Sequence, residues 1–151
     1  TPRDARQLKP QFKFHYAGEL PVFATSHVFS GEIDRNADRD IDDLFYCDMP
    51  WVLSDSPLKQ TLQKLWPAQI HYGRFFALGA DAYNLMPLLG RLQANTWERF
   101  SGHTGNIYLD PQNRLHRELL WARFVKGIPL LLDVNNPNAY ASSRRDDETD
   151  E

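Results

Sequence analysis

The pattern of apolar and polar residues predicts that helices and strands follow one another along the first part of the chain. A run of antiparallel strands is predicted after them. Residues 1–18 predict a helix with Thr1 as its N-cap, Pro2 at its first position and Gly18 as its stop. Its apolar positions recur at helical spacing and predict a buried face: Ala5, Leu8, Phe12 and Tyr16. Pro10 predicts a kink within this helix.

Two short apolar runs follow, at residues 20–29 and 43–50, and both predict strands that are buried on two faces. Helix, strand, loop and strand in this order favour an α/β architecture with parallel strands. The length of 151 residues corresponds to one domain.

Two further helices are expected after the second strand. The first covers residues 56–66, with Ser56 as N-cap and Pro67 as its limit. Its expected buried face consists of Leu58, Leu62, Leu65 and Trp66. The second covers residues 74–93, bends at Pro87, and is expected to approach a neighbour closely at Gly79. Its shared apolar face consists of Phe75, Leu78, Ala82, Leu85 and Leu89.

The segment 104–133 predicts antiparallel β structure appended to the α/β part. A type I turn is expected at Pro111, and a second turn at residues 126–127. Between these turns, residues 115–125 predict a single strand in which Trp121 has a structural role.

Composition and charge narrow the function. Apolar residues make up 42% of the chain and aromatic residues 13%, as in a globular protein. The net charge is −3, and residues 144–151 carry two Arg and five acids, so the other 143 residues sum to zero. No basic face of the size that nucleic acid requires is therefore expected. The charged segment 137–151 predicts a disordered acidic tail, which leaves residues 1–136 as the folded part.

The sequence has few features that indicate a cellular compartment or a redox role. No apolar run approaches 18 residues, so no membrane span is expected, and no signal peptide is recognisable. Because the first residue is Thr1, we expect the chain to be a piece of something longer. The single cysteine, Cys47, excludes an intrachain disulfide and lies in an apolar run typical of a buried, inert thiol.

The acidic segment 32–43 raises the question of a calcium loop. Oxygen ligands fit positions 1, 3 and 5 at Asp34, Asn36 and Asp38. Arg39 stands where the loop needs Gly, and Phe45 stands where it needs a bidentate Glu. We therefore expect a polar loop with internal Arg–Asp pairs and no structural calcium.

No catalytic constellation is recognisable. The five histidines form no metal-binding pair, so neither a metal nor a cofactor is expected, and the segment 101–105, with two Gly, predicts a tight turn. A catalytic Ser26–His27 pair is disfavoured because adjacent strand residues point to opposite faces. Asp48 and Asp81 could act as a carboxylate pair only if the fold brings them together.

Polar residues follow the two predicted strands at their carboxyl ends, where open parallel sheets bind ligands. They are Thr25, Ser26, Asp48 and Trp51. These residues either line a ligand or partner crevice, or are simply strand-to-loop junctions. No Arg is evident beside them, which favours a protein partner over a charged small ligand.

Four blocks of sequence, in order, resemble the C-terminal part of the LppC/LpoA lipoproteins. They lie at residues 5–31, 43–53, 75–85 and 101–132, within a resemblance that covers about residues 3–133. More distantly, the pattern is similar to that of type I periplasmic solute-binding proteins. The resemblance implies the second half of a two-lobed α/β binding-protein fold, with a parallel sheet, helices and an antiparallel β segment.

The same resemblance implies a function. Family members activate bifunctional class A penicillin-binding proteins, the peptidoglycan synthases, and face the periplasm from the outer membrane. We therefore expect a non-enzymatic regulator that docks on such a synthase, with membrane attachment only through a lipid anchor outside this chain. The alternative is a periplasmic solute-binding module for a small polar ligand.

Overall fold

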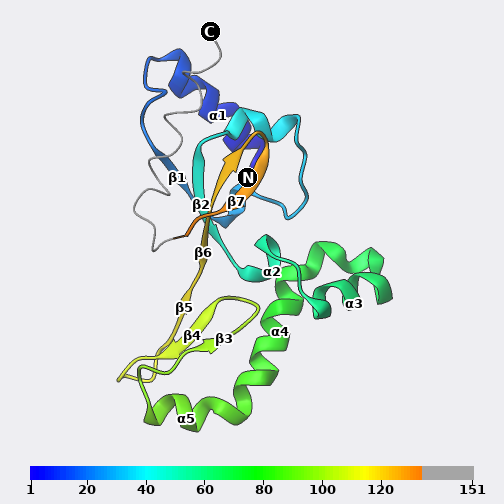
Figure 1. Cartoon of the computed structure of the whole chain (residues 1–151), viewed down its shortest axis with the longest axis vertical. Coiled ribbons are helices and arrows are strands. Elements are labelled where there is room, and N and C mark those ends of the chain that lie inside the picture. Colours follow the sequence, from blue (N-terminus) through cyan, green and yellow to red (C-terminus); the bar gives the residue numbers. More distant parts are fainter. Residues whose placement is uncertain (134–151) are drawn as a thin grey trace. The chain divides into compact units, whose positions relative to one another are not determined.

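The structure is a computed structural model that describes residues 1–133. The predicted acidic tail, residues 137–151, lies outside the described residues. The chain divides into two compact units. Unit 1 contains Thr1–Cys47 and the chain from Trp121 onward, and unit 2 contains Asp48–Leu120. Figure 1 shows the elements of both units in sequence colours.

Unit 1 is built on a four-stranded sheet with the strand order β1-β2-β6-β7. Its elements are α1 (Pro2–Phe14), β1 (Val22–Ala24), η1 (Ser26–Val28), η2 (Ala37–Ile41), β2 (Leu44–Asp48), β6 (Leu120–Val125) and β7 (Ile128–Leu131). Strands β1 and β2 run parallel, as predicted, whereas β6 and β7 are antiparallel. The sheet is therefore mixed.

The α1 helix begins as the sequence predicts. The Thr1 hydroxyl accepts a hydrogen bond from the Asp4 amide, and the Asp4 carboxylate accepts one from the Thr1 hydroxyl at 2.6 Å. The predicted buried face is wrong beyond Ala5, because Leu8 is 56% exposed and Tyr16 is fully exposed. Pro10 lies inside the helix, which continues to Phe14.

The strand predicted over residues 20–29 is also wrong in extent. The strand covers only Val22–Ala24, and the chain turns into the 3-10 helix η1 at Ser26. Burial on both faces is wrong too, because Phe23 is 57% exposed. Strand β1 lies at the edge of the sheet, where fewer neighbours cover its side chains.

The core of unit 1 is aromatic. The rings of Tyr46 and Phe124, from the neighbouring strands β2 and β6, stack with centroids 5.1 Å apart. Phe29 packs edge-on against Phe124 at 5.8 Å. Trp121 is only half-buried and meets the edge of Phe23 at 6.1 Å, so its structural role stays a prediction.

Unit 2 joins a helical segment to a three-stranded antiparallel sheet with the order β3-β4-β5. Its elements are α2 (Pro50–Leu53), α3 (Pro57–Leu65), η3 (Pro67–Tyr72), α4 (Gly73–Leu85), η4 (Met86–Leu88), α5 (Leu89–Ala94), β3 (Phe100–Ser101), β4 (Asn106–Leu109) and β5 (Leu115–Glu118). Its apolar cluster consists of Leu85, Leu92, Ile107 and Leu109, with Phe100 packed against it.

The predicted helix starts are correct, but the predicted buried faces are not. Ser56 caps α3 by accepting a hydrogen bond from the Lys59 amide at 3.2 Å, yet α3 has no fully buried residue. In α4 the buried residues are Ala77, Asp81 and Leu85, and only Leu85 belongs to the predicted face. The predicted bend at Pro87 is confirmed as the 3-10 turn η4 between α4 and α5.

The antiparallel segment is confirmed, with one difference. Strands β4 and β5 pair around the predicted turn, where Asn113 donates its amide hydrogen to Asp110 at 2.9 Å. Residues 115–125 do not form one strand, because the chain passes from β5 in one sheet to β6 in the other. The second predicted turn is confirmed at Gly127, where φ is +72° and a Cβ would lie 2.3 Å from the Arg35 carbonyl oxygen.

Candidate functional site

Asp48 is the last residue of β2, and its carboxylate is at the centre of the best-defined polar site of unit 2. Its carboxylate is 1% exposed. The Met49 amide donates to Oδ1 at 2.8 Å, and Arg74 Nη2 donates to Oδ2 in a short ion pair. A buried carboxylate requires such a partner, because an unpaired charge away from water is very costly. The Arg74 side chain as a whole remains 35% exposed.

The sequence missed Arg74 as a partner of Asp48, and the expectation of no Arg at this site is wrong. Arg74 stands 26 residues further along the chain, at the first turn of α4. A separation of that size carries no local signal, since only the fold brings the two side chains together.

Trp51 packs at the same end of unit 2. Its backbone amide donates to the His103 carbonyl oxygen at 2.9 Å, and its ring meets the edge of the His103 ring at 5.5 Å. The residue is 6% exposed. A Cβ at position 73 would lie 2.8 Å from Trp51 Nε1, so Gly73 permits the close approach of α4 to the indole. The geometry gives Trp51 a packing role.

Asp81 holds the predicted tight turn at residues 101–105. Its Oδ1 accepts from the His103 amide at 2.8 Å. Its Oδ2 accepts from the Thr104 amide and from the Thr104 hydroxyl, both at 2.7 Å. Asp81 and Thr104 are each 1% exposed. Asp48 and Asp81 thus have separate sets of hydrogen-bond partners, and each carboxylate holds a neighbouring segment in place.

Thr25 and Ser26 belong to unit 1. Thr25 is the N-cap residue of η1, and its Oγ1 lies 3.5 Å from His27 Nδ1. Because Ser26 and His27 lie in a 3-10 helix, the argument from opposite strand faces does not apply to them. Thr25 is exposed and Ser26 is half-buried, whereas Asp48 and Trp51 belong to unit 2. A crevice lined by all four residues stays a prediction.

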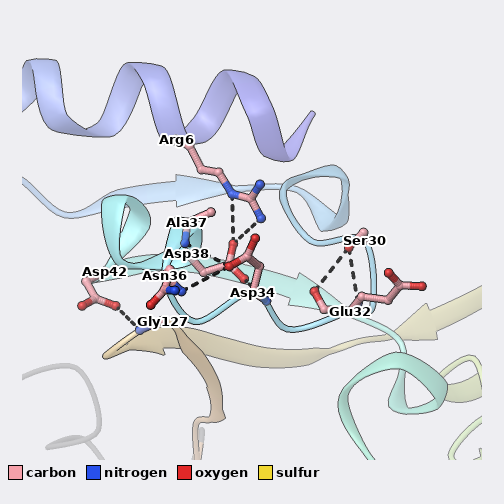
Figure 2. A network of polar contacts seen from close by, with 9 residues as sticks. All are labelled: Arg6, Ser30, Glu32, Asp34, Asn36, Ala37, Asp38, Asp42 and Gly127. Carbon is pink, nitrogen blue, oxygen red and sulfur yellow. Dashed lines mark hydrogen bonds and ion pairs between the residues drawn. The ribbon is translucent and has the colours of Figure 1, made fainter.

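The acidic loop between β1 and β2 is held by its own carboxylates (Figure 2). Asp38 is 1% exposed, and its Oδ1 accepts from Arg6 Nη2 at 2.7 Å and Nε at 3.1 Å. Its Oδ2 accepts from the Asp34 amide at 3.1 Å. Arg–Asp pairing was expected within the loop, but the arginine comes from α1 instead.

Two further carboxylates of this loop bind backbone. Asp34 Oδ1 accepts from the amides of Asn36 and Ala37, at 3.2 and 3.1 Å. Asp42 Oδ1 accepts from the Gly127 amide at 2.8 Å and so ties the loop to the β6–β7 turn. Within residues 1–133, no group of three or more His, Cys, Asp or Glu is placed to hold a metal ion. The absence of structural calcium from this loop stays a prediction, which a calcium titration can test.

The carboxylates of Asp4 and Asp110 both have a pKa below the ordinary value, and that of Asp110 is lowered far. His116 Nε2 lies 2.9 Å from Asp110 Oδ2, and the hydrogen bond between them is the largest cause that lowers the pKa of Asp110 far below its usual value. Hydrogen bonds from the Arg114 amide and side chain act in the same direction. Asp110 also accepts from the Gln112 amide, so it organises the β4–β5 turn.

Residues 1–127 match the family described as "LppC putative lipoprotein". The chain belongs to the LppC family. The resemblance predicted from the sequence blocks is confirmed.

Curated relatives in this family carry the name "Penicillin-binding protein activator LpoA". One from Vibrio vulnificus is 33% identical over 99 residues, which cover 62% of this chain and 16% of the relative. One from Pectobacterium parmentieri is 23% identical over 136 residues, which cover 87% of this chain and 20% of the relative. The chain thus spans about a fifth of the length of these relatives.

Solved structures share the fold. The C-domain of LpoA from Haemophilus influenzae, titled "a regulator of PBP1A", aligns with a TM-score of 0.73 at 22% identity, over 87% of this chain and 42% of that one. A "putative branched-chain amino acid ABC transporter" from Chromobacterium violaceum aligns with a TM-score of 0.55 at 24% identity, over 81% of this chain and 39% of that one. The predicted fold class, α/β and similar to periplasmic binding proteins, is confirmed.

Among residues 1–133, no helix has both the length and the apolar character needed to cross a bilayer.

Proposed function

We propose that this chain is part of a non-enzymatic regulator that activates a bifunctional class A penicillin-binding protein by docking on it. The observation that carries the proposal is the family match over residues 1–127, together with the activator name that the curated relatives share. The buried carboxylates agree with it. Asp38, Asp48 and Asp81 are all engaged by arginine, hydroxyl or backbone donors that hold the fold.

Activation by docking requires that the regulator bind the active state of the synthase more tightly than the less active state. The gain in activity is limited by this difference in binding free energy, and tight binding alone produces none. The stimulation should therefore rise with regulator concentration along the binding curve and then saturate. A regulator of this kind acts stoichiometrically and does not modify peptidoglycan by itself.

The proposed setting is the periplasm, with the protein held at the outer membrane by a lipid outside these 151 residues. The family description as a lipoprotein supports this proposal. The proposed contact residues are Thr25 and Ser26 within unit 1 and, taken separately, Asp48 and Trp51 within unit 2. Because Asp48 and Trp51 are buried, their contribution is to shape the surface of unit 2, whereas exposed Thr25 in unit 1 can touch a partner directly.

The test is a muropeptide assay of a purified class A penicillin-binding protein, with and without this protein. The protein is supplied both as the 151-residue chain and as the complete product of its gene. We expect more cross-linked muropeptides, in proportion to bound regulator, and no change in peptidoglycan when the regulator is present alone. Unchanged cross-linking despite measured binding to the synthase would refute activation.

A second candidate function is a solute-binding module for a small polar ligand. Two observations favour it: the fold shared with the Chromobacterium violaceum protein, and the partly exposed Arg74 side chain beside buried Asp48. A guanidinium of this kind can bind a ligand carboxylate. Calorimetry against amino acids and muropeptides separates the two candidates. Micromolar binding of a ligand, with no effect on any class A synthase, would establish the second candidate in place of the first.

A further inference from the structure

Arg123 is a buried cation in the sheet of unit 1. Its strand, β6, lies between β2 and β7, and the residue is 9% exposed. Two nitrogens of its guanidinium, Nε and Nη1, are fully buried and have no hydrogen-bond partner among residues 1–133. Buried polar groups nearly always have such partners, because their lost contacts with water must be replaced. An unpaired guanidinium at this depth therefore requires an explanation.

Asp43 compensates the charge of Arg123 only weakly. Its Oδ1 lies 3.9 Å from Arg123 Nη1, which is beyond hydrogen-bond distance. The Asp43 side chain is 60% exposed, so water screens its charge. The Asp43 backbone is fixed, because its amide donates to the Phe124 carbonyl oxygen at 2.9 Å. Within the described residues, the guanidinium thus lacks a strong acceptor.

Aromatic rings share the face of the sheet on which Arg123 lies. Trp121 stands two residues earlier in β6, and alternate residues of a strand point to the same face. The Trp121 ring meets the edge of Phe23 at 6.1 Å, and Phe23 stacks on Phe45 at 5.3 Å. The Arg123 guanidinium lies 6.0 Å from the centroid of the Phe45 ring. We call these four residues, Phe23, Phe45, Trp121 and Arg123, the Arg123 face.

The Arg123 face is separate from the aromatic core of unit 1. Phe124 is the next residue in β6 and points to the opposite face, where its ring stacks on Tyr46. The Arg123 face is also partly open, since Phe23 is 57% exposed and Trp121 is half-buried. It therefore combines a buried cation with aromatic surface that another molecule can reach.

A carboxylate is the anion that fits this guanidinium best. Its two oxygens accept parallel hydrogen bonds from one edge of an arginine, and each edge of Arg123 contains an unpaired nitrogen, Nε or Nη1. Such charge-assisted bonds are strong in apolar surroundings, because little water competes for them. The acid Asp43 nearby opposes a doubly charged phosphate more than a singly charged carboxylate. An apolar or aromatic group beside the carboxylate would pack on Phe23 and Trp121.

We propose that Arg123 is the binding site for a carboxylate that carries an apolar or aromatic group. The site uses none of the proposed synthase contacts, and it stands whether or not the chain activates a synthase. A guanidinium buried without an acceptor destabilises a fold, and an apolar residue of similar size at its position is often neutral or stabilising. The binding of a carboxylate gives this buried charge a role that stability alone does not.

Titration calorimetry tests the proposal on the 151-residue chain and on the complete product of its gene. The probes are benzoate, a free small acid, and N-acetylphenylalanine, which has the C-terminal carboxylate of a peptide. The controls are N-acetylphenylalanine amide, which lacks the carboxylate, and inorganic phosphate. We expect at least one of the two carboxylates to bind with a dissociation constant on the order of 1 mM, and both controls to bind at least about tenfold more weakly. The carboxylate that binds more tightly identifies the source, a small acid or a peptide end.

Substitutions separate a ligand site from a structural role. Arg123→Met should abolish binding yet keep or raise the melting temperature, because it replaces an unpaired buried charge with an apolar side chain. Arg123→Lys keeps the charge but loses the planar edge, so binding should weaken about tenfold. Asp43→Asn should tighten binding roughly threefold, since it removes a competing acid. Arg91→Met is the matched control and should bind normally, because Arg91 is an exposed arginine of unit 2.

Three outcomes overturn the proposal. Neither carboxylate could bind more tightly than the amide and phosphate controls. Arg123→Met could bind the carboxylates as the wild type does, which would place the site elsewhere. Arg123→Met could lower the melting temperature of the chain or of the complete gene product by about 5 °C or more, which would mean that the guanidinium is paired within the same molecule, through Asp43 or another segment.

Discussion

Replacing Asp81 with alanine should destabilise the protein more than most single substitutions. The carboxylate accepts three hydrogen bonds, from the His103 amide, the Thr104 amide and the Thr104 hydroxyl, at 2.7–2.8 Å. The residue is 1% exposed, so its removal leaves donors in a site that water reaches poorly. Hydrogen bonds to a charged group contribute about 1.5–3 kcal/mol each, and buried donors left unpaired add a further cost.

These contributions are not additive, because the donors share one turn and can relax together. We expect a loss of about 3–5 kcal/mol for Asp81→Ala, a large part of the roughly 5–15 kcal/mol that stabilises a typical domain. At this chain length the melting temperature should fall by about 10 °C. Asp81→Asn should lose less, because one amide oxygen can still accept a hydrogen bond while its NH₂ group faces a donor.

Calorimetry measures the stability, and amide hydrogen exchange locates the effect. Protection should fall first at His103 and Thr104. Asp55→Ala is the matched control, since the Asp55 side chain is 77% exposed and its nearest cation, Lys59, is 3.7 Å away. Gly102→Ala should reproduce the defect, because a Cβ there would lie 2.5 Å from Asp81 Oδ2. A melting temperature within 2 °C of the wild type for Asp81→Ala would refute the assigned role of this carboxylate.

Three other predictions follow from the polar contacts. Arg6→Ala should cost about 3–5 kcal/mol by chemical denaturation, because it leaves the Asp38 carboxylate buried without its cation; a loss below 1 kcal/mol would contradict the importance of this pair. Asp110→Asn should lower the melting temperature more at pH 7 than at pH 2. A pKa that is lowered in the folded state gives stability that is fully present above the ordinary value near 4, declines below that value, and is lost as the pH falls through the lower folded-state pKa, so a pH-independent difference would exclude this mechanism. Calcium at 1 mM should leave the melting temperature unchanged, since the acidic loop already uses its carboxylates on Arg6 and on backbone amides; a rise of several degrees would reveal a site.

The sequence alone was sufficient for features that depend on a few neighbouring residues. Helix starts at Thr1 and Ser56 follow from side chains that accept hydrogen bonds from amides three residues later. The break at Pro87 follows from a missing amide hydrogen, and the turn at residues 126–127 from a glycine with positive φ. The order of the sequence blocks was also sufficient to indicate the family and its fold class.

Only the tertiary structure decided which faces are buried and which charges meet. An apolar stripe shows that a helix has a preferred side, but burial depends on whether another segment covers that side, and the stripes of α1 and α4 remain largely exposed. The partners of Asp48 and Asp38 stand 26 and 32 residues away in the chain, at Arg74 and Arg6. Periodicity along the chain describes neighbours within one element, whereas an ion pair between elements depends on packing geometry that no local pattern contains.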